Sequence, residues 1–320
     1  MLLWAVFTIV IVAMLALDLG VFHRRPHEIR LREALTWSVV WISLAMAFLV
    51  LVYFWRGPRV ALEFLTCYLI EESLSVDNLF VFLVIFSYFN VPKALHHRVL
   101  FWGIVGAVVM RAVFIVVGVT VIERFEWVVY ALGALLIVTG IRMAIHEERD
   151  IHPERNPVLL LVRRFIPVSA NYVEGHFFTR QGARLVATPL FVVLLVVETT
   201  DVAFAIDSVP AALAITLDPF VVFTSNIFAI LGLRSLYFAL AGIMPMFVYL
   251  HYGLSVILVF TGVKMIAAHW VKIPIGAALG VVAGVLALSV VASVWRSRRL
   301  GPPSPEALQR DHGHDSRIGG

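Results

Sequence analysis

Long runs of apolar residues, separated by short charged or proline-containing stretches, constrain this chain more than any other feature. A helix needs about 20 mostly apolar residues to cross a bilayer. We read nine such runs, at 2–22, 35–55, 61–89, 99–121, 126–145, 185–209, 219–241, 246–268 and 274–295. Only 14% of the residues are charged, against roughly 25% in soluble domains. The sequence therefore predicts an all-α polytopic membrane bundle of about nine transmembrane helices.

Basic residues are distributed unevenly between successive loops, and this asymmetry predicts the orientation of the chain. The loop after the first run carries four arginines between residues 24 and 32, whereas the loop after the second carries Arg56 and Arg59. Cytoplasmic loops are the ones enriched in Lys and Arg. We therefore expect a multi-pass protein of the inner (plasma) membrane, with its N-terminus outside and its C-terminus in the cytoplasm.

Two segments fall outside the predicted spans. The connection 146–184 mixes aliphatic residues with Arg163 and Arg164, and it either lies on the lipid headgroups or is a solvated linker. The last residues of the chain are polar and turn-rich, a composition typical of disorder. We expect an integral membrane domain over 1–296 and a disordered cytoplasmic tail over 297–320.

Spans three to five resemble spans six to eight in the order and spacing of their polar residues. TGIRM at 139–143 parallels TGVKM at 261–265. The other matched pairs are Arg111 with Arg234, Glu71 with Asp201, Asp77 with Asp207, and Asn78 with Ser208. A unit with an odd number of spans must enter the membrane in the opposite sense when it repeats. We therefore predict inverted repeats over about 61–145 and 185–268, an arrangement typical of secondary transporters, with chance recurrence as the competing explanation.

Ionisable residues inside the third and sixth spans are the strongest functional signal. An ionised group at the centre of a membrane helix costs about 2.5–3.5 kcal/mol on insertion scales, so these acids must be paired, protonated or metal-bound. The predicted metal ligands are Glu71, Glu72, Asp77, Asn78, Glu198, Asp201 and Asp207. Supporting or counter-charge residues are Ser75, Ser208, Asn226, Arg111 and Arg234. A salt-bridge network that merely holds the bundle is the alternative interpretation.

Helical spacing places some of these groups together and separates others. Glu71, Ser75 and Asn78 fall on one face of the third span, while Glu72 and Asp77 lie off that stripe. Those two converge with the others only if the helix is broken or if other spans supply the opposing wall.

Three further residues have a simpler interpretation. Pro210, which follows the acids of the sixth span, either breaks that helix or serves packing. Glu63 lies near the end of a span, as does Asp218, and we interpret both as interfacial residues.

The predicted ligands indicate which ion would bind. Carboxylate, amide and hydroxyl oxygens suit Mg²⁺, Ca²⁺ and Mn²⁺, whereas Zn²⁺ and Cu⁺ prefer imidazole and sulfur; these two spans contain no histidine, and their one sulfur is that of Cys67. Cys67 is the single cysteine, so the chain can build neither an internal disulfide nor a thiolate metal site. We expect no prosthetic group, and a transported hard divalent cation as the bound species.

Several motifs together resemble the TerC family of integral membrane proteins. They are DLGVFHRRPHEIRLREA at 18–34, EESLSVDNLFVF at 71–82, NPVLLLVRRFIPV at 156–168, ETTDVAFAIDSVPA at 198–211 and NIFAILGLRSLYF at 226–238. The resemblance implies an inner-membrane protein named for tellurium resistance and grouped with cation exporters of the LysE superfamily, which move Mn²⁺ outward. It also implies that the acids of both motifs bind metal.

From the residues and this resemblance we expect a transporter that exports Mn²⁺ or a similar ion, with acids that also exchange protons. The alternative is a non-transporting membrane subunit of a metal or tellurite stress-resistance complex. We do not expect an enzyme, because no HExxH, GxSxG or phosphate-binding glycine loop is present. Expected partners are the cation, the lipid bilayer and either further copies of the chain or stress-complex subunits, but no nucleic acid.

Overall fold

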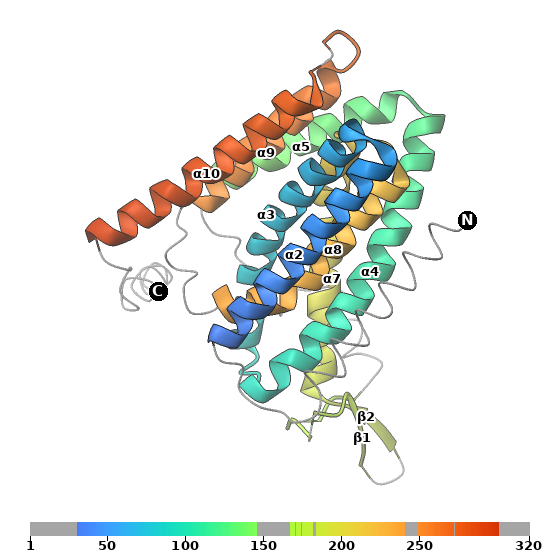
Figure 1. Ribbon diagram of the computed structural model, residues 1–320. Coiled ribbons are helices and arrows are strands. Elements are labelled where there is room, and N and C mark those ends of the chain that lie inside the picture. Colours follow the sequence, from blue (N-terminus) through green and yellow to red (C-terminus); the bar gives the residue numbers. More distant parts are fainter. Residues whose placement is uncertain are drawn as a thin grey trace, which may run out of the picture.

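The computed structural model describes residues 31–145, 167–169, 171–173, 175–181, 184–240, 249–271 and 273–300. Within these ranges the chain forms helices joined by short turns, together with two short strands (Figure 1). The helices are α2 (Leu31–Arg56), α3 (Pro58–Tyr88), α4 (Lys93–Arg124), α5 (Trp127–Ile145), α7 (Pro189–Leu213), α8 (Pro219–Leu240), α9 (Leu250–Ala267) and α10 (Ile275–Leu300).

Six of these helices are long and apolar enough to cross a membrane, namely α2, α4, α5, α7, α9 and α10. Many of their large apolar side chains are exposed, including Phe54 at 81% and Leu288 at 71%, as expected for helices that face lipid. Exposed tryptophans mark helix ends, with Trp55 in the last turn of α2 and Trp127 at the start of α5. Tryptophan at this position is typical of the membrane–water interface.

Proline and glycine set where several helices begin. Pro58, Pro189 and Pro219 are the first residues of α3, α7 and α8, a position where the missing backbone N–H costs nothing. The turn from α2 into α3 is Gly57, whose φ of 90° is a conformation that glycine adopts easily. This turn is therefore tight, and it brings the end of α2 directly to the start of α3.

The centre of the bundle is built from α3, α4, α7 and α8 (Figure 1). Helix α3 packs against both α7 and α8, and α4 packs against the same two helices. Helix α2 covers α8 and α3 from one side, while α10 covers α9 and α3. Residues placed on α3, α4, α7 and α8 can therefore meet inside the protein.

Among the helices that the structure describes, α5 and α9 share the most extensive contact. A Cβ added to Gly133 would meet the Gly262 carbonyl, and one added to Gly140 would meet the Ser255 carbonyl. Gly133 of α5 faces Gly262 of α9, and the later Gly140 faces the earlier Ser255, so the two helices run antiparallel. Glycines permit this close approach of two backbones, as they do in other membrane helix pairs.

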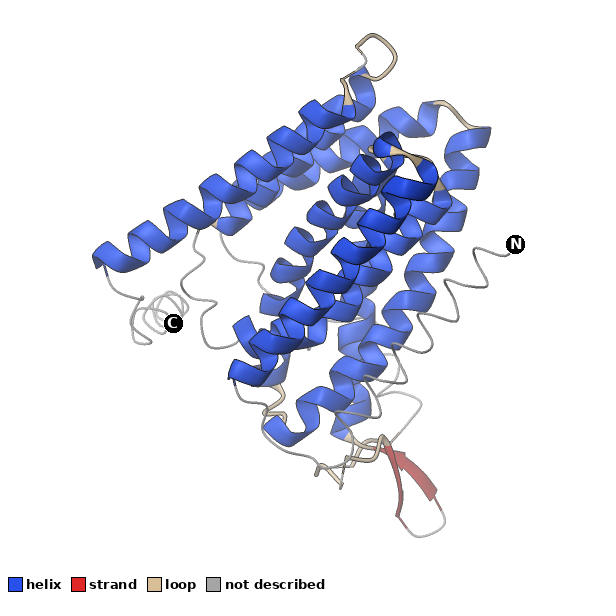
Figure 2. Ribbon diagram, viewed as in Figure 1, coloured by secondary structure: helices blue, strands red, loops and turns tan. Residues whose placement is uncertain are grey.

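A short antiparallel hairpin of β1 (Phe178–Gln181) and β2 (Arg184–Ala187) precedes α7 (Figure 2). In the register, Phe178 is opposite Ala187 and Gln181 is opposite Arg184. The hairpin lies at the opposite end of the bundle from the α2–α3 turn (Figure 1). Next to it, the Tyr172 hydroxyl donates a hydrogen bond of 2.8 Å to the Phe89 carbonyl just after α3.

The predicted spans from 35–55 onward each correspond to one described helix, and the ends differ by a few residues. The largest differences are at α4, which begins at Lys93 where the span was predicted from 99, and at α10, which ends at Leu300 where the span was predicted to end at 295. In the span predicted over 185–209, residues 185–187 belong to β2 and the helix begins at Pro189. The hairpin itself was not predicted; the other described elements are all helices, as the all-α prediction requires. Helix α10 continues to Leu300, beyond the predicted domain end at 296.

Some predictions concern residues that the structure does not describe. The span over 2–22, most of the connection 146–184 and the tail from residue 301 lie outside the described ranges. Nine spans were predicted, and eight helices occupy the described residues.

Candidate ion-binding site

Buried polar side chains follow one face of α3 through its first two thirds. Glu71, Ser75 and Asn78 are almost completely buried, with exposed fractions of 0%, 1% and 3%. The helix is continuous from Pro58 to Tyr88, so the predicted stripe is confirmed without a break in the backbone. Other helices must then supply the opposing wall.

Helix α7 supplies part of that wall. Asp201 and Ser208 are buried on it, while Glu198 and Asp207 are half-buried. Pro210 lies inside the helix, which continues to Leu213. Of the two interpretations of Pro210, packing within a continuous helix is therefore the correct one.

Arg111 of α4 joins the acids of α3 and α7. Its Nη1 donates hydrogen bonds to Oε2 of Glu71 and, at 2.7 Å, to Oδ1 of Asn226 on α8. Its Nε lies 3.9 Å from Oδ2 of Asp201. A single arginine therefore pairs with carboxylates from two helices, while its predicted role as the counter-charge of an ion site stays a prediction.

This cluster is enclosed by protein on all sides. Arg111 is 1% exposed, Glu71 and Asn226 are 0% exposed, and Asp201 is 4% exposed. Removing one partner from such a buried charge pair typically costs about 3–5 kcal/mol, because the remaining charge is left unpaired. The four residues therefore depend on one another.

Several buried polar atoms around the cluster have no hydrogen-bond partner. Those on α3, α4, α7 and α8 are Glu71 Oε1, Glu72 Oε2, Ser75 Oγ, Arg111 Nε, Asp201 Oδ2, Ser208 Oγ and Asn226 Nδ2. Native proteins satisfy roughly 90% or more of such atoms, so a local concentration of exceptions calls for a bound water, a bound ion or a functional role. Most of these atoms are oxygens, which hard cations bind.

A small cavity lies between α3, α5, α7 and α9, about two turns beyond Glu71 on α3 and beyond Asp201 on α7. Asn78, Asp207 and Ser208 line it, and its apolar wall is Leu74, Met143, Phe204 and Leu258. The Thr139 hydroxyl of α5 donates a hydrogen bond of 3.1 Å to Oδ1 of Asp207. Thr139 was not predicted as a site residue, although its TG motif marked the predicted repeat.

The remaining acids lie close to the cluster but have different neighbours. Glu198 rests directly on the backbone of α4, where a Cβ added to Gly106 would overlap its carboxylate. Glu72 interacts with Tyr68, one turn earlier on α3. The predicted set is therefore spread over several sub-sites instead of one compact shell.

Two predicted residues cannot be placed, because the side chains of Asp77 and Arg234 lie outside the described part of the chain. Within that part, no three His, Cys, Asp or Glu side chains converge on a point where they could hold a metal ion. The ligand set of the sequence analysis stays a prediction, and the oxygens described above include amide and hydroxyl groups.

The fold and the site define a class: a multi-pass α-helical membrane protein whose bundle encloses a charged, oxygen-rich centre. A family model described as "Integral membrane protein TerC family" matches residues 56–300. The chain belongs to the TerC family. The resemblance drawn from its sequence motifs is thereby confirmed.

Relatives cover nearly the whole chain. A protein of Myxococcus xanthus, named "Uncharacterized membrane protein STKORF319", is 51% identical over 92% of this chain and 93% of the relative. Proteins named "Putative membrane-bound redox modulator Alx" are 45% identical in Salmonella typhi, over 92% of this chain and 94% of the relative, and in Escherichia coli (strain K12), over 93% and 96%. No solved structure matches the chain.

Proposed function

We propose that this protein is a secondary transporter that exports a hard divalent cation, foremost Mn²⁺, across the inner membrane. The observation that carries the proposal is the arginine-linked cluster of Glu71, Asp201 and Asn226, in which Glu71 Oε1 and Asp201 Oδ2 accept no hydrogen bond. Each buried polar group without a partner costs about 1–3 kcal/mol, so these oxygens need a bound water or a bound ion. An arriving cation would satisfy them.

Charge balance supports a cationic substrate. Glu71, Glu198, Asp201 and Asp207 lie on α3 and α7, and within the described residues Arg111 is the counter-charge that contacts Glu71 and Asp201. When ionised, these acids exceed the charge that one guanidinium can neutralise. Either protons or a divalent cation would neutralise the excess, so exchange of one for the other would couple export to a proton gradient.

Helix contacts support the inverted repeats that we propose as the basis of alternating access. The repeats would relate α3 to α7, α4 to α8 and α5 to α9. If α3 corresponds to α7 and α8 corresponds to α4, then the packing of α3 against α8 should have an equivalent in the packing of α7 against α4. Both pairs of helices are in extensive contact. It also makes α5 and α9 antiparallel neighbours. Secondary transporters place their substrate where such halves meet.

The names of the Alx relatives suggest a second candidate, a role in redox modulation. This chain has a single cysteine, Cys67, which is buried, so it cannot cycle an internal dithiol–disulfide couple. A redox effect would have to act through a redox-active cargo such as manganese, or through a partner in a stress complex. The transport proposal accommodates the first of these routes.

A flux assay tests the proposal. The purified protein is reconstituted in liposomes with an imposed pH gradient. Entry of Mn²⁺, Ca²⁺, Mg²⁺ and Zn²⁺ is then compared by the change in fluorescence of an indicator trapped inside the liposomes. We expect Mn²⁺ flux that collapses with the gradient and falls at least tenfold in Asp201→Asn, the loss of one charged ligand being worth about 1.5–3 kcal/mol. Glu126→Gln, an exposed acid between α4 and α5, is the matched control and should retain flux. Flux no greater than that of empty liposomes would refute transport.

A further inference from the structure

The buried stripe on α3 does not stop at Glu71. Cys67 and Glu63 continue it toward the start of the helix at intervals of four residues, and they are 0% and 7% exposed. At 1.5 Å of rise per residue, Glu63 lies about 12 Å along the helix axis from Glu71. The stripe thus leads from the arginine-linked cluster to the α2–α3 turn.

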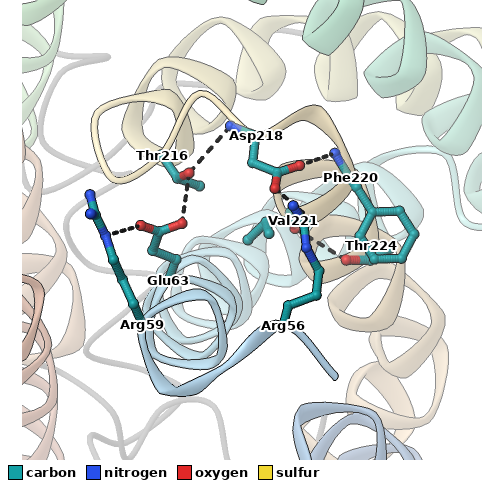
Figure 3. Close-up of polar contacts among 8 residues, drawn as sticks. All are labelled: Arg56, Arg59, Glu63, Thr216, Asp218, Phe220, Val221 and Thr224. Carbon is teal, nitrogen blue, oxygen red and sulfur yellow. Dashed lines mark hydrogen bonds and ion pairs between the residues drawn. The ribbon is translucent and has the colours of Figure 1, made fainter. Parts of the chain in front are cut away.

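At that turn the Glu63 carboxylate is bonded on both of its oxygens (Figure 3). The Thr216 hydroxyl, in the connection between α7 and α8, donates to Oε2 at 2.9 Å, and Arg59 Nε donates to Oε1 at 3.3 Å. The Glu63 side chain is 10% exposed and that of Arg59 is 85% exposed. Glu63 therefore lies at the boundary between the buried stripe and the surface.

A second polar contact joins the α2–α3 turn to the α7–α8 connection (Figure 3). Arg56 Nη1, at the end of α2, lies 2.6 Å from Oδ2 of Asp218. Oδ1 of Asp218 accepts a hydrogen bond of 3.0 Å from the Phe220 backbone N–H, which caps the start of α8. We call the two contacts Glu63–Thr216 and Arg56–Asp218 the corner latch, since they join the α2–α3 turn to the α7–α8 connection.

A buried cation lies behind the latch. Lys264 of α9 is 9% exposed, and its Nζ donates a hydrogen bond of 3.1 Å to the Ala214 carbonyl at the end of α7. It also lies close enough to the Glu63 carboxylate for an electrostatic interaction. Its positive charge would repel a cation that moved along the stripe, so the route is closed to a cation while Lys264 holds this position.

The other end of α3 offers no comparable route. From Leu79 onward, the buried side chains described on this helix are apolar, and they pack with Leu190 and Val193 of α7 and with Tyr237 of α8. The Tyr237 hydroxyl is hydrogen-bonded to Nδ1 of His96 at 3.1 Å, and the described side chains of that wall include no carboxylate that could bind a cation. The polar side chains of α3 lead toward one end of the bundle.

We propose that the stripe from Glu71 past Cys67 to Glu63 is the route by which the cation leaves the buried cluster, and that the corner latch is its closed gate. The inference rests on the proposed transport function. The Glu63 carboxylate would accept the departing cation in place of Thr216 and Arg59, so the cation itself would weaken one half of the latch. By the distribution of basic residues, this exit faces the outer side of the membrane.

The single cysteine provides a direct test, because Cys67 lies on the proposed route behind the latch. The full-length protein in liposomes is treated with a membrane-impermeant methanethiosulfonate, and labelling of Cys67 is followed by mass spectrometry. Thr216→Val removes the hydroxyl that holds Glu63, and Asp218→Asn weakens the ion pair but keeps an oxygen for the α8 cap. Losing a charge-assisted hydrogen bond shifts an equilibrium by about tenfold or more, so each variant should label about tenfold faster than the parent. The double variant should label faster still.

Two controls separate a local gate from general loosening. Cys67→Ala alone should abolish labelling, both in the parent protein and in each latch variant. Ile85→Cys, introduced together with Cys67→Ala, reports on the apolar end of α3 and should label at the same rate with and without the latch substitutions. Unchanged Cys67 labelling in both latch variants would overturn the proposal, as would equal acceleration at position 85.

Mn²⁺ flux measured on the same liposomes distinguishes failure of the gate from failure of the transport proposal. Flux with no effect of the latch on Cys67 labelling refutes the gate alone. If the latch substitutions accelerate Cys67 labelling but no Mn²⁺ flux is measured, the gate is supported and the proposal that the protein transports Mn²⁺ is refuted.

Discussion

The two halves of α3 differ in what they bury. From Pro58 to Asn78 the helix buries carboxyl, hydroxyl and amide groups together with apolar side chains such as Phe64 and Ile70, whereas from Leu79 to Tyr88 all its described buried side chains are aliphatic or aromatic. Both halves pack against α7, so the difference lies in chemistry and not in the degree of enclosure. We infer that the second half supplies stability, and that the first half exchanges some stability for a polar route and an ion site.

Substitution of Arg111 should have the largest effect on the buried polar groups of α3. In Arg111→Gln the carboxylates of Glu71 and Asp201 lose their shared counter-charge, and we expect the protein to be destabilised by about 3–5 kcal/mol. Thermal unfolding in detergent measures the change. Arg124→Gln, an exposed basic residue in the last turn of the same helix, should change stability little. Equal effects of the two substitutions would show that the buried network is not a mutually dependent unit.

Ile85 tests the apolar half. It is 0% exposed, and Ile85→Ala should cost about 2–5 kcal/mol through lost packing and the cavity that remains. Mn²⁺ flux per folded molecule should stay within twofold of the parent, because no charged residue is altered. Unfolding and flux are measured on one preparation. A fall in flux much larger than the loss of folded protein would show that this half also takes part in transport.

Two glycines one turn apart on α4 compare the two environments directly. A Cβ at Gly106 would overlap the Glu198 carboxylate, whereas one at Gly103 would lie 3.2 Å from Cγ1 of Val197. Overpacking typically costs about 1–3 kcal/mol, and Glu198 can move away because its chain is flexible. We expect Gly106→Ala to lower Mn²⁺ flux several-fold with a modest loss of stability, and Gly103→Ala to leave flux unchanged. The opposite ranking in the liposome assay would remove Glu198 from the site.

The smallest effect is expected at Arg59. Its side chain is 85% exposed, and exposed ion pairs typically contribute about 0–1 kcal/mol. Arg59→Ala should therefore leave the melting temperature almost unchanged, and it should accelerate Cys67 labelling less than Thr216→Val does. If Arg59→Ala had the larger effect on labelling, the surface charge and not the Thr216 hydroxyl would hold Glu63 closed.

Much of this architecture follows from the order of residues. The apolar runs predicted the helices, and the four-residue spacing of Glu71 and Ser75 predicted the buried stripe. The hairpin at 178–187 was missed because its strands are only four residues long and are stabilised by pairing with each other. Glu63 was interpreted as merely interfacial, since the spacing of residues in one helix cannot show that Thr216 lies opposite it.

The sequence by itself determined that the chain crosses a membrane, which residues are charged inside it and which face of α3 carries them, because helical periodicity and hydropathy are local properties. Only the tertiary structure decided that one arginine serves acids from α3 and α7, that Asn226 completes this cluster, and that Asp207 has Thr139 as its donor. These pairings depend on how the helices cross, which is fixed by packing between residues that are far apart in the chain.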